Sequence, residues 1–248
     1  MKKGTYTKGF NFGYFFIKLS SPDSWAEKEL SQLYTNKSSK EYFREINKLG
    51  IPVAKIFFEA NYKNFQIIIQ KKELGITLNE FLKTTTSETS LLIFKEILTY
   101  YKLISKANNL LIDWNLNNFI INKKNQIKLI DCNPPLSISI VKKYPESQLK
   151  LLYLNNNIQL CSLLGYWLQC RFHLSKKEFI DEFYQLTKEL KREFKFDIEK
   201  YINNCESNHI LLEKIKLIIK LKNNKIEFSK FKNQYLTFSL KKEIMKGR

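Results

Sequence analysis

Residues 110–135 read LLIDWNLNNFIINKKNQIKLIDCNPP, and this stretch decides the fold. Asp113 is followed five positions later by Asn118, and Asp131 closes an apolar run thirteen positions after Asn118. A loop places Asp113 and Asn118 on the same side of the chain, and the end of the next strand brings a third oxygen-bearing side chain to them. The spacing therefore predicts two carboxylates and one amide that converge at one point of the fold.

The sequence around this stretch is mainly helical in pattern. Apolar residues recur at helical spacing over residues 90–107, which predicts a helix that ends at Asn108 and Asn109. Short apolar runs within the stretch predict small strands, at residues 110–113, 119–122 and 127–131. Beyond the two prolines that close it, three more helices are predicted, near residues 147–171, 175–196 and 206–222. The chain from residue 75 onward is therefore predicted to be mainly helical.

The first 74 residues favour strands, with two helices inserted. An aromatic-rich run over residues 9–19 predicts a strand, and two later runs predict an antiparallel pair, at residues 53–58 and 65–70. Ser24 and Ser38 each stand three positions before a glutamate, which is the pattern of a capping box and predicts a helix start. Gly50 is expected to end the second helix. We expect an α+β protein with a small β-rich part, residues 1–74, and a mainly helical part, residues 75–248.

Oxygen-bearing side chains at this spacing suit phosphoryl transfer. The reaction needs a carboxylate near the attacking hydroxyl and hard oxygen ligands that hold Mg²⁺ against the phosphates. In protein kinases and small-molecule phosphotransferases, an Asp-x-x-x-x-Asn loop supplies a base and a metal ligand, and the next strand delivers a second carboxylate. The alternative is that these are ordinary loop residues, because aspartate and asparagine favour turns and two prolines follow closely after Asp131.

The chain resembles the protein-kinase-like superfamily, in particular its aminoglycoside phosphotransferase, choline kinase and lipopolysaccharide kinase branch. The likeness lies in the loop described above and in IIIQKKELGITLNEFL, residues 67–82, which looks like the hinge of that branch. LGIPVAKIFF, residues 49–58, is similar to the strand that follows its regulatory helix. The resemblance covers residues 14–135. It implies a two-lobed, protein-kinase-like fold with a small N-lobe, complete or truncated, and a mainly helical C-lobe.

The resemblance also implies an activity and its central residues. Asp113 corresponds to the catalytic base or hydroxyl-orienting group, and Asn118 and Asp131 correspond to the magnesium ligands. The implied enzyme is an ATP- and Mg²⁺-dependent phosphotransferase that modifies a hydroxyl on a small molecule, a sugar or a lipid head group. A protein substrate is less expected, because the segment after Asp131 is short and lacks Ala-Pro-Glu.

The nucleotide-binding residues implied by the resemblance lie earlier in the chain. Lys18, within a Phe-Phe-Ile-Lys-Leu run, would contact the α- and β-phosphates of ATP. Its partner would be a glutamate on the helix before Gly50. We favour Glu45, and two other glutamates are alternatives, Glu29 and Glu41. Backbone groups near Lys72 and Leu74 would receive the adenine.

Three features depart from the family pattern. Leu111 stands where the family often has histidine, and Cys132 and Asn133 stand where many kinases have Phe-Gly. Only 17 residues precede Lys18, and the glycines among them do not form G-x-G-x-x-G, so the phosphate-covering loop is shortened or absent. The alternative function is therefore a catalytically inactive, kinase-like binding module that docks on a protein or nucleic acid through a basic surface.

Composition narrows the choice of partners and location. The net charge of +18 favours phosphate-bearing partners, namely a nucleotide, an anionic acceptor, nucleic acid or an anionic membrane surface. Four of the 42 basic residues are arginine, which weakens the case for sequence-specific reading of nucleic acid. No apolar run is long enough to span a membrane. The four cysteines are scattered, so we expect reduced thiols without a metal, in a cytoplasmic protein that is free or peripheral at a membrane.

Overall fold

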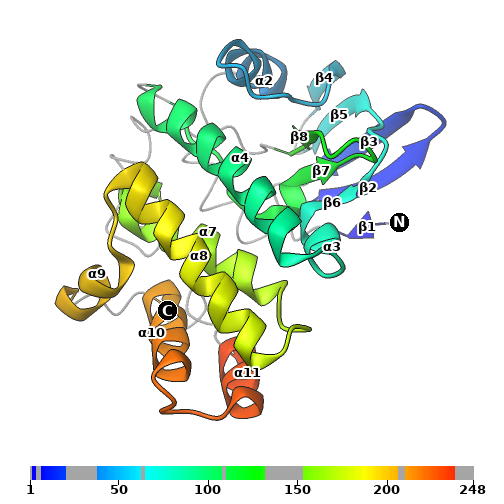
Figure 1. The fold of residues 1–248 in the computed structure, drawn as a ribbon. Helices are drawn as coiled ribbons and strands as arrows, with labels where there is room; N and C mark the ends of the chain where they lie inside the picture. Colours follow the sequence, from blue (N-terminus) through cyan, green and yellow to red (C-terminus); the bar gives the residue numbers. More distant parts are fainter. Residues whose placement is uncertain are drawn as a thin grey trace, which may run out of the picture. The chain divides into compact units, whose positions relative to one another are not determined.

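The computed structural model describes residues 2–3, 7–20, 38–62, 65–107, 110–131, 153–205 and 210–237. Packing divides the chain into two compact units. The first unit comprises residues 1–78 and 100–145, and the second comprises residues 79–99 and 146–248. The described strands fall in the first unit, and the second unit is helical (Figure 1). The predicted α+β class is confirmed, whereas a lobe boundary between residues 74 and 75 stays a prediction.

The first unit contains a five-stranded antiparallel sheet with strand order β1-β2-β3-β5-β4. The strands are β1 (Lys2–Lys3), β2 (Thr7–Phe12), β3 (Phe15–Ser20), β4 (Ile56–Tyr62) and β5 (Phe65–Lys71). The single strand predicted over residues 9–19 is in fact a hairpin. Gly13, with φ of 55°, and Tyr14 close a two-residue turn between β2 and β3. The predicted antiparallel pair is confirmed as β4 and β5.

Helix α2 (Ser39–Lys48) begins with the predicted capping box. The Ser38 side chain accepts from the Glu41 N–H at 3.2 Å, and the Glu41 carboxylate accepts from the Ser38 N–H at 3.0 Å. Glu59 of β4 also accepts from the first two N–H groups of the helix, at 2.9 and 3.0 Å. Gly50 follows the helix with φ of 87°, a backbone conformation that favours glycine. The capping box predicted at Ser24 lies outside the described residues.

A second, three-stranded sheet with order β6-β7-β8 also lies in the first unit. Its strands are β6 (Ile76–Thr77), β7 (Phe119–Ile121) and β8 (Ile127–Leu129), and the short 3₁₀ helix η1 (Leu116–Asn118) precedes β7. The strand predicted over residues 110–113 does not form. The Leu129 N–H donates to Pro52 O at 2.9 Å, and the Ala54 N–H donates to Leu129 O at 2.8 Å. These bonds join β8 to the segment before β4.

Four of the described helices of the second unit correspond to the predicted ones, with different ends. They are α3 (Leu78–Leu82) and α4 (Ser87–Lys106), which both continue into the first unit, and α7 (Asn156–Gln169), α8 (Lys176–Phe194), α9 (Ile198–Asn204), α10 (Ile210–Lys222) and α11 (Phe228–Thr237). Helix α9 was not predicted. It is separate from α8 because Lys195 adopts φ of 55°, which ends α8, and Asp197 then caps α9 by accepting from the Lys200 N–H.

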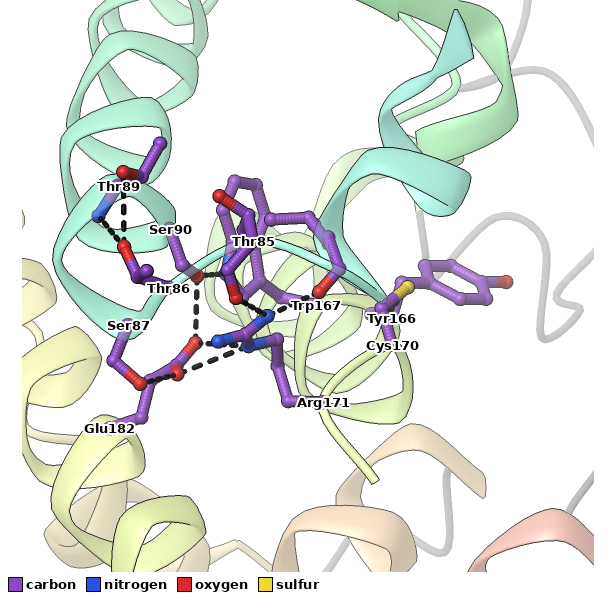
Figure 2. A network of polar contacts seen from close by, with 11 residues as sticks. Thr85, Thr86, Ser87, Thr89, Ser90, Tyr166, Trp167, Cys170, Arg171 and Glu182 are labelled. Atoms are coloured by element: carbon purple, nitrogen blue, oxygen red, sulfur yellow. Dashed lines mark hydrogen bonds and ion pairs between the residues drawn. The ribbon is translucent and has the colours of Figure 1, made fainter. Parts of the chain in front are cut away.

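A buried ion pair joins helix α8 to the turn after α7 (Figure 2). Arg171 and Glu182 side chains are 0% and 1% exposed, and Arg171 Nε lies 2.9 and 3.1 Å from the two Glu182 carboxylate oxygens. Ser87 and Ser90 of α4 each donate a hydroxyl to Glu182 at 2.7 Å. Arg171 Nη1 donates to two carbonyls, that of Leu82 at the end of α3 and that of Thr85 before α4. The pair thus connects three helical segments inside the second unit.

Lys214 of α10 is a buried cation with an aromatic neighbour. It is 7% exposed, and its Nζ lies 4.8 Å from the centre of the Tyr235 ring. Removal from water lowers the pKa of Lys214 to about 8, because burial disfavours the charged form. The charged side chain therefore costs free energy in the folded state.

Replacing Lys214 by methionine is expected to stabilise the folded chain at neutral pH by about 1–3 kcal/mol, since the apolar stem is kept and the charge is lost. Between pH of about 8 and 10.5 the unfolded chain binds a proton that folded Lys214 has released. The unfolding free energy of the wild type therefore rises with pH across this window, and the advantage of the variant shrinks. Urea denaturation at neutral and alkaline pH measures both effects.

The matched control is Lys220→Met, which removes an exposed lysine from the same helix. It is expected to leave the urea midpoint nearly unchanged. Equal midpoints for Lys214→Met and the wild type at neutral pH would contradict the assignment of a destabilising buried charge.

The described cysteines are free thiols. Cys161 and Cys170 are buried, and burial raises the pKa of Cys170 to about 11. Both thiols therefore stay protonated and unreactive near neutral pH, as the sequence predicts for core positions; Cys132 lies outside the described residues. Across the described ranges, the structure contains no helix with both the length and the apolar content needed to cross a bilayer.

Candidate active site

Lys18 lies on β3 and points to the end of β8. Its side chain is 5% exposed, and Nζ lies 3.1 Å from Asp131 Oδ1. The same Nζ donates to Ile130 O at 2.8 Å. Lys18 and Asp131 are far apart in sequence, so only the fold brings them together. Because a buried ammonium requires compensation, these two oxygens fix Lys18 beside the carboxylate that follows β8.

The loop before β7 holds Asp113 and Asn118 in contact. Asn118 Nδ2 donates to both Asp113 O and Asp113 Oδ2, each at 3.1 Å. The Asn115 N–H donates to Asp113 Oδ1 at 3.1 Å. Asn115 also caps η1, because its side chain accepts from the Asn117 N–H. This hydrogen bond stabilises a tight turn of the chain between Asp113 and Asn118. The five-residue spacing therefore places the carboxylate and the amide side by side.

The β7–β8 hairpin carries Asn118 to Asp131. Register pairs Phe119 with Leu129, and the Ile130 N–H donates to Asn118 O at 2.8 Å. Asn118 is therefore hydrogen-bonded through its backbone to the residue just before Asp131. The three predicted residues and Lys18 form one continuous set of contacts within the first unit.

Electrostatics distinguish Asp113 from an ordinary surface aspartate. The surrounding protein atoms weaken its hydration and raise its pKa above the usual 3.8, although the side chain keeps an exposed surface. The two hydrogen bonds from Asn115 and Asn118 oppose this shift, and the negative charge of Asp131 adds to it. A raised pKa suits a group that accepts a proton during a reaction.

Gln70 is a site residue that the sequence analysis missed. It lies on β5 and is 2% exposed, and its Nε2 donates to Ile130 O at 3.2 Å, the same carbonyl that accepts from Lys18. Its Oε1 is buried without a hydrogen-bond donor in the described part of the chain. A buried oxygen without a donor is rare and marks a position where a ligand or water can bind. A polar residue in the apolar run IIIQ was the available signal.

The expected nucleotide-binding residues are placed as follows. Glu45 lies half-buried on α2, and among the described residues the ion-pair partner of Lys18 is Asp131 rather than Glu45. Glu41 belongs to the capping box, and Glu29 lies outside the described residues. The pairing of Lys18 with a glutamate of this helix stays a prediction.

The linker that follows β5 is held by a backbone hydrogen bond and an ion pair. The Lys72 N–H donates to Tyr14 O at 2.9 Å, and Leu74 is 80% exposed. Between them, Glu73 forms an ion pair of 2.8 Å with Lys128 of β8. The adenine contacts expected at Lys72 and Leu74 stay a prediction. The Glu73–Lys128 pair was not predicted, and it ties the linker to the hairpin that carries the site.

The oxygen donors present are chemically suited to Mg²⁺. Magnesium is commonly held by one or two protein oxygens together with phosphate oxygens and waters. The amide oxygen of Asn118 and the carboxylate of Asp131 are such donors. Within the described ranges no cluster of three or more His, Cys, Asp or Glu side chains could hold a metal alone. At Asn118 and Asp131, a magnesium ion would complete its coordination with waters and phosphate oxygens.

The order of elements is that of a kinase-like fold. A lysine-bearing strand, a helix, two strands, a linker, an Asp–Asn loop and a hairpin that leads to an aspartate follow one another. This is the order that the sequence resemblance implies, and the expected α+β fold, with the described strands in one unit and a second unit that is helical, is confirmed.

Comparison with solved structures gives low overall similarity. The chain is similar to the co-crystal structure of WbdD and the kinase inhibitor LY294002, with 12% identity and a TM-score of 0.44 over 86% of this chain and 49% of that one. A second crystal structure of WbdD matches with 11% identity and a TM-score of 0.43 over 79% and 47%. This chain therefore spans about half the length of these structures. No protein-family model and no curated protein sequence matches it.

Proposed function

We propose that the chain is an ATP- and Mg²⁺-dependent phosphotransferase that modifies a hydroxyl group of a small molecule, a sugar or a lipid head group. The observation that supports it best is the contact between buried Lys18 and Asp131 next to a hydrogen-bonded Asp113–Asn118 pair. A cation for phosphates, two oxygen donors for magnesium and a carboxylate for the hydroxyl are the groups that phosphoryl transfer uses.

Each residue has a separate role in this proposal. Asp113 orients the acceptor hydroxyl and takes up its proton as the new bond to the γ-phosphorus of ATP forms and the bond from that phosphorus to the leaving ADP oxygen breaks. The raised pKa of Asp113 favours this proton uptake. Bound magnesium would neutralise phosphate charge, and Asn118 and Asp131 would hold it. Lys18, fixed by the Ile130 carbonyl, donates to the phosphates. The net charge of +18 favours an anionic acceptor, and the proposed location is the cytoplasm, free or at a membrane surface.

The second candidate function is an inactive, kinase-like binding module. One observation favours it: the Lys18 ammonium directly contacts Asp131, so a cation of the protein already lies against the proposed magnesium ligand. The Lys18–Asp131 pair is therefore neutral without a metal. Both functions share the fold, and they differ in whether nucleotide and magnesium bind.

Nucleotide binding is tested by thermal unfolding with ATP and Mg²⁺. A ligand present at about 100 times its Kd stabilises the folded state by about 2.7 kcal/mol, so the melting temperature is expected to rise by several degrees. Asp131→Asn keeps the side-chain shape but removes the charge that holds magnesium, and it is expected to abolish the rise. The rise is measured for each variant against its own melting temperature without nucleotide.

Asp181→Asn is the matched control, since it removes an exposed carboxylate from α8. It should retain the full rise. If the wild type shows no rise at millimolar ATP with Mg²⁺, the phosphotransferase proposal is wrong and the binding module is favoured.

A further inference from the structure

The five-stranded sheet has one face that carries apolar side chains exposed to solvent. Residues directly opposite each other in an antiparallel pair lie on the same face. Register pairs Phe12 with Phe15, Phe10 with Ile17, and Phe58 with Ile69. The alternation of each strand places these residues opposite to the face of Lys18. Phe57 joins them at the bulge of β4, where its ring lies 5.5 Å from the Phe15 ring, edge to face. We call this surface the aromatic face; its phenylalanines are Phe10, Phe12, Phe15, Phe57 and Phe58.

These phenylalanines are exposed to solvent. The exposed fraction is 69% for Phe12 and 51% for Phe58, and it exceeds a third for each of the others. Helix α2 packs on the opposite face, because Glu59, which binds its N-terminus, pairs in register with Ile68 on the face of Lys18. A contiguous aromatic surface of this kind on one sheet indicates a binding surface.

The charges around the aromatic face have one sign. Lys71 is paired with Phe15 and exposed, and Lys55 Nζ lies 5.2 Å from the centre of the Phe57 ring. Among the other positions of this face whose side chains the structure describes, the residues are apolar, namely Ile17, Leu19, Ala60, Ile67 and Ile69. The aromatic face therefore combines apolar side chains with lysines, in a chain whose net charge is +18.

This chemistry fits a lipid surface better than a protein or nucleic acid. Protein interfaces are enriched in arginine and depleted of lysine, whereas lysine supplies nearly all the basic residues of this chain. Single-stranded nucleic acid stacks on aromatic rings, but the middle of this sheet is aliphatic, formed by Ile17, Ile67 and Ile69. Phenylalanines that enter the boundary between head groups and acyl chains, with lysines at the phosphates, are typical of interfacial binding.

We propose that the first unit docks on an anionic phospholipid bilayer through the aromatic face. The phenylalanines enter the boundary region, and Lys55 and Lys71 contact lipid phosphates. Docking requires both parts, because single apolar side chains and single charges each contribute weakly. The proposal does not depend on nucleotide binding, so it can fail while the phosphotransferase proposal stands.

The test is sedimentation of the full chain with vesicles of phosphatidylcholine containing about one third phosphatidylglycerol. The wild type is expected to bind these vesicles and not vesicles of phosphatidylcholine alone. Phe12→Ser with Phe58→Ser should lower the partition coefficient by about tenfold or more, because two exposed apolar anchors are lost. Lys55→Gln with Lys71→Gln should lower it by about fivefold or more.

The control variant is Leu92→Ser with Leu236→Ser, which removes similarly exposed apolar residues, 59% and 55%, from the second unit. It should bind vesicles as the wild type does. Phe12→Trp gives an independent readout. The difference between its fluorescence and that of the wild type, which has three tryptophans, should shift to shorter wavelength on binding. Unchanged melting temperatures show that the variants fold.

Three results would overturn the proposal. One is no binding of the wild type to the anionic vesicles, and another is equal binding by the wild type and the Phe12/Phe58 variant. The third is a dimer or an RNA complex that the Phe12/Phe58 variant loses while vesicle binding is absent. That result would assign the aromatic face to a second copy of the chain or to nucleic acid.

Discussion

Replacing Asp113 by asparagine should slow ATP turnover by about 10²–10⁴-fold, the range attributed to a general base. Asparagine keeps the shape of the side chain and can still accept from the Asn115 N–H, which lies 3.1 Å from Asp113 Oδ1. It cannot take up the proton of the acceptor. Because the acceptor is unidentified, the assay is magnesium-dependent hydrolysis of ATP, with water as the acceptor.

The same variant should keep its thermal response to ATP and Mg²⁺, since Asn118 and Asp131 are unchanged. This split between turnover and binding separates a role in chemistry from a role in folding. Asp181→Asn again serves as the control and should hydrolyse ATP at the wild-type rate. Undiminished hydrolysis by Asp113→Asn would show that another group accepts the proton.

Replacing Glu182 by alanine should destabilise the folded chain by about 3–5 kcal/mol, because Arg171 is left as a buried charge without its partner. The guanidinium is fully buried, and Glu182 accepts from its Nε and from the Ser87 and Ser90 hydroxyls (Figure 2). For a chain of this length the melting temperature should fall by about 6–20 °C. Differential scanning calorimetry measures the change.

The double variant Arg171→Met with Glu182→Leu should be much milder than Glu182→Ala, since apolar residues of similar size can replace a buried ion pair at little cost. Lys191→Ala is the surface control. Lys191 is 68% exposed and pairs with Asp197, which is 39% exposed, and an exposed pair of this kind contributes little to stability. Should the double variant prove as unstable as Glu182→Ala, the loss would come from packing and not from an uncompensated charge.

Local patterns predicted the parts of the structure that depend on nearby residues. The capping box at Ser38 needed only Glu41 three positions later, and the helix formed as expected. The convergence of Asp113 and Asn118 also follows from a short loop. Residue spacing predicted that Asp131 would join them, because an apolar hairpin returns the chain to the same point.

Other features depend on the whole fold and left no local signal. The turn at Gly13 and Tyr14 contains a large aromatic residue, so an uninterrupted strand was the reasonable expectation. Lys195 ends α8 in a left-handed conformation that is usually adopted by glycine. Because no glycine marks the end of α8, the sequence did not indicate that α9 is a separate helix. The Arg171–Glu182 pair forms because several segments pack around it. The periodicity of the sequence does not predict such packing.

The number of residues in β7 and in β8 determines the direction in which the site residues point. Three pairs separate Asn118 from the turn, and Asn125 takes a positive φ of 57° within that turn. Since neighbouring side chains of a strand alternate between faces, one residue gained or lost in β7 or β8 would turn Asp131 away from Lys18. Length changes between Asn122 and Gln126 leave that alternation intact. Insertions and deletions are therefore tolerated in the turn of the hairpin, whereas the lengths of β7 and β8 are constrained.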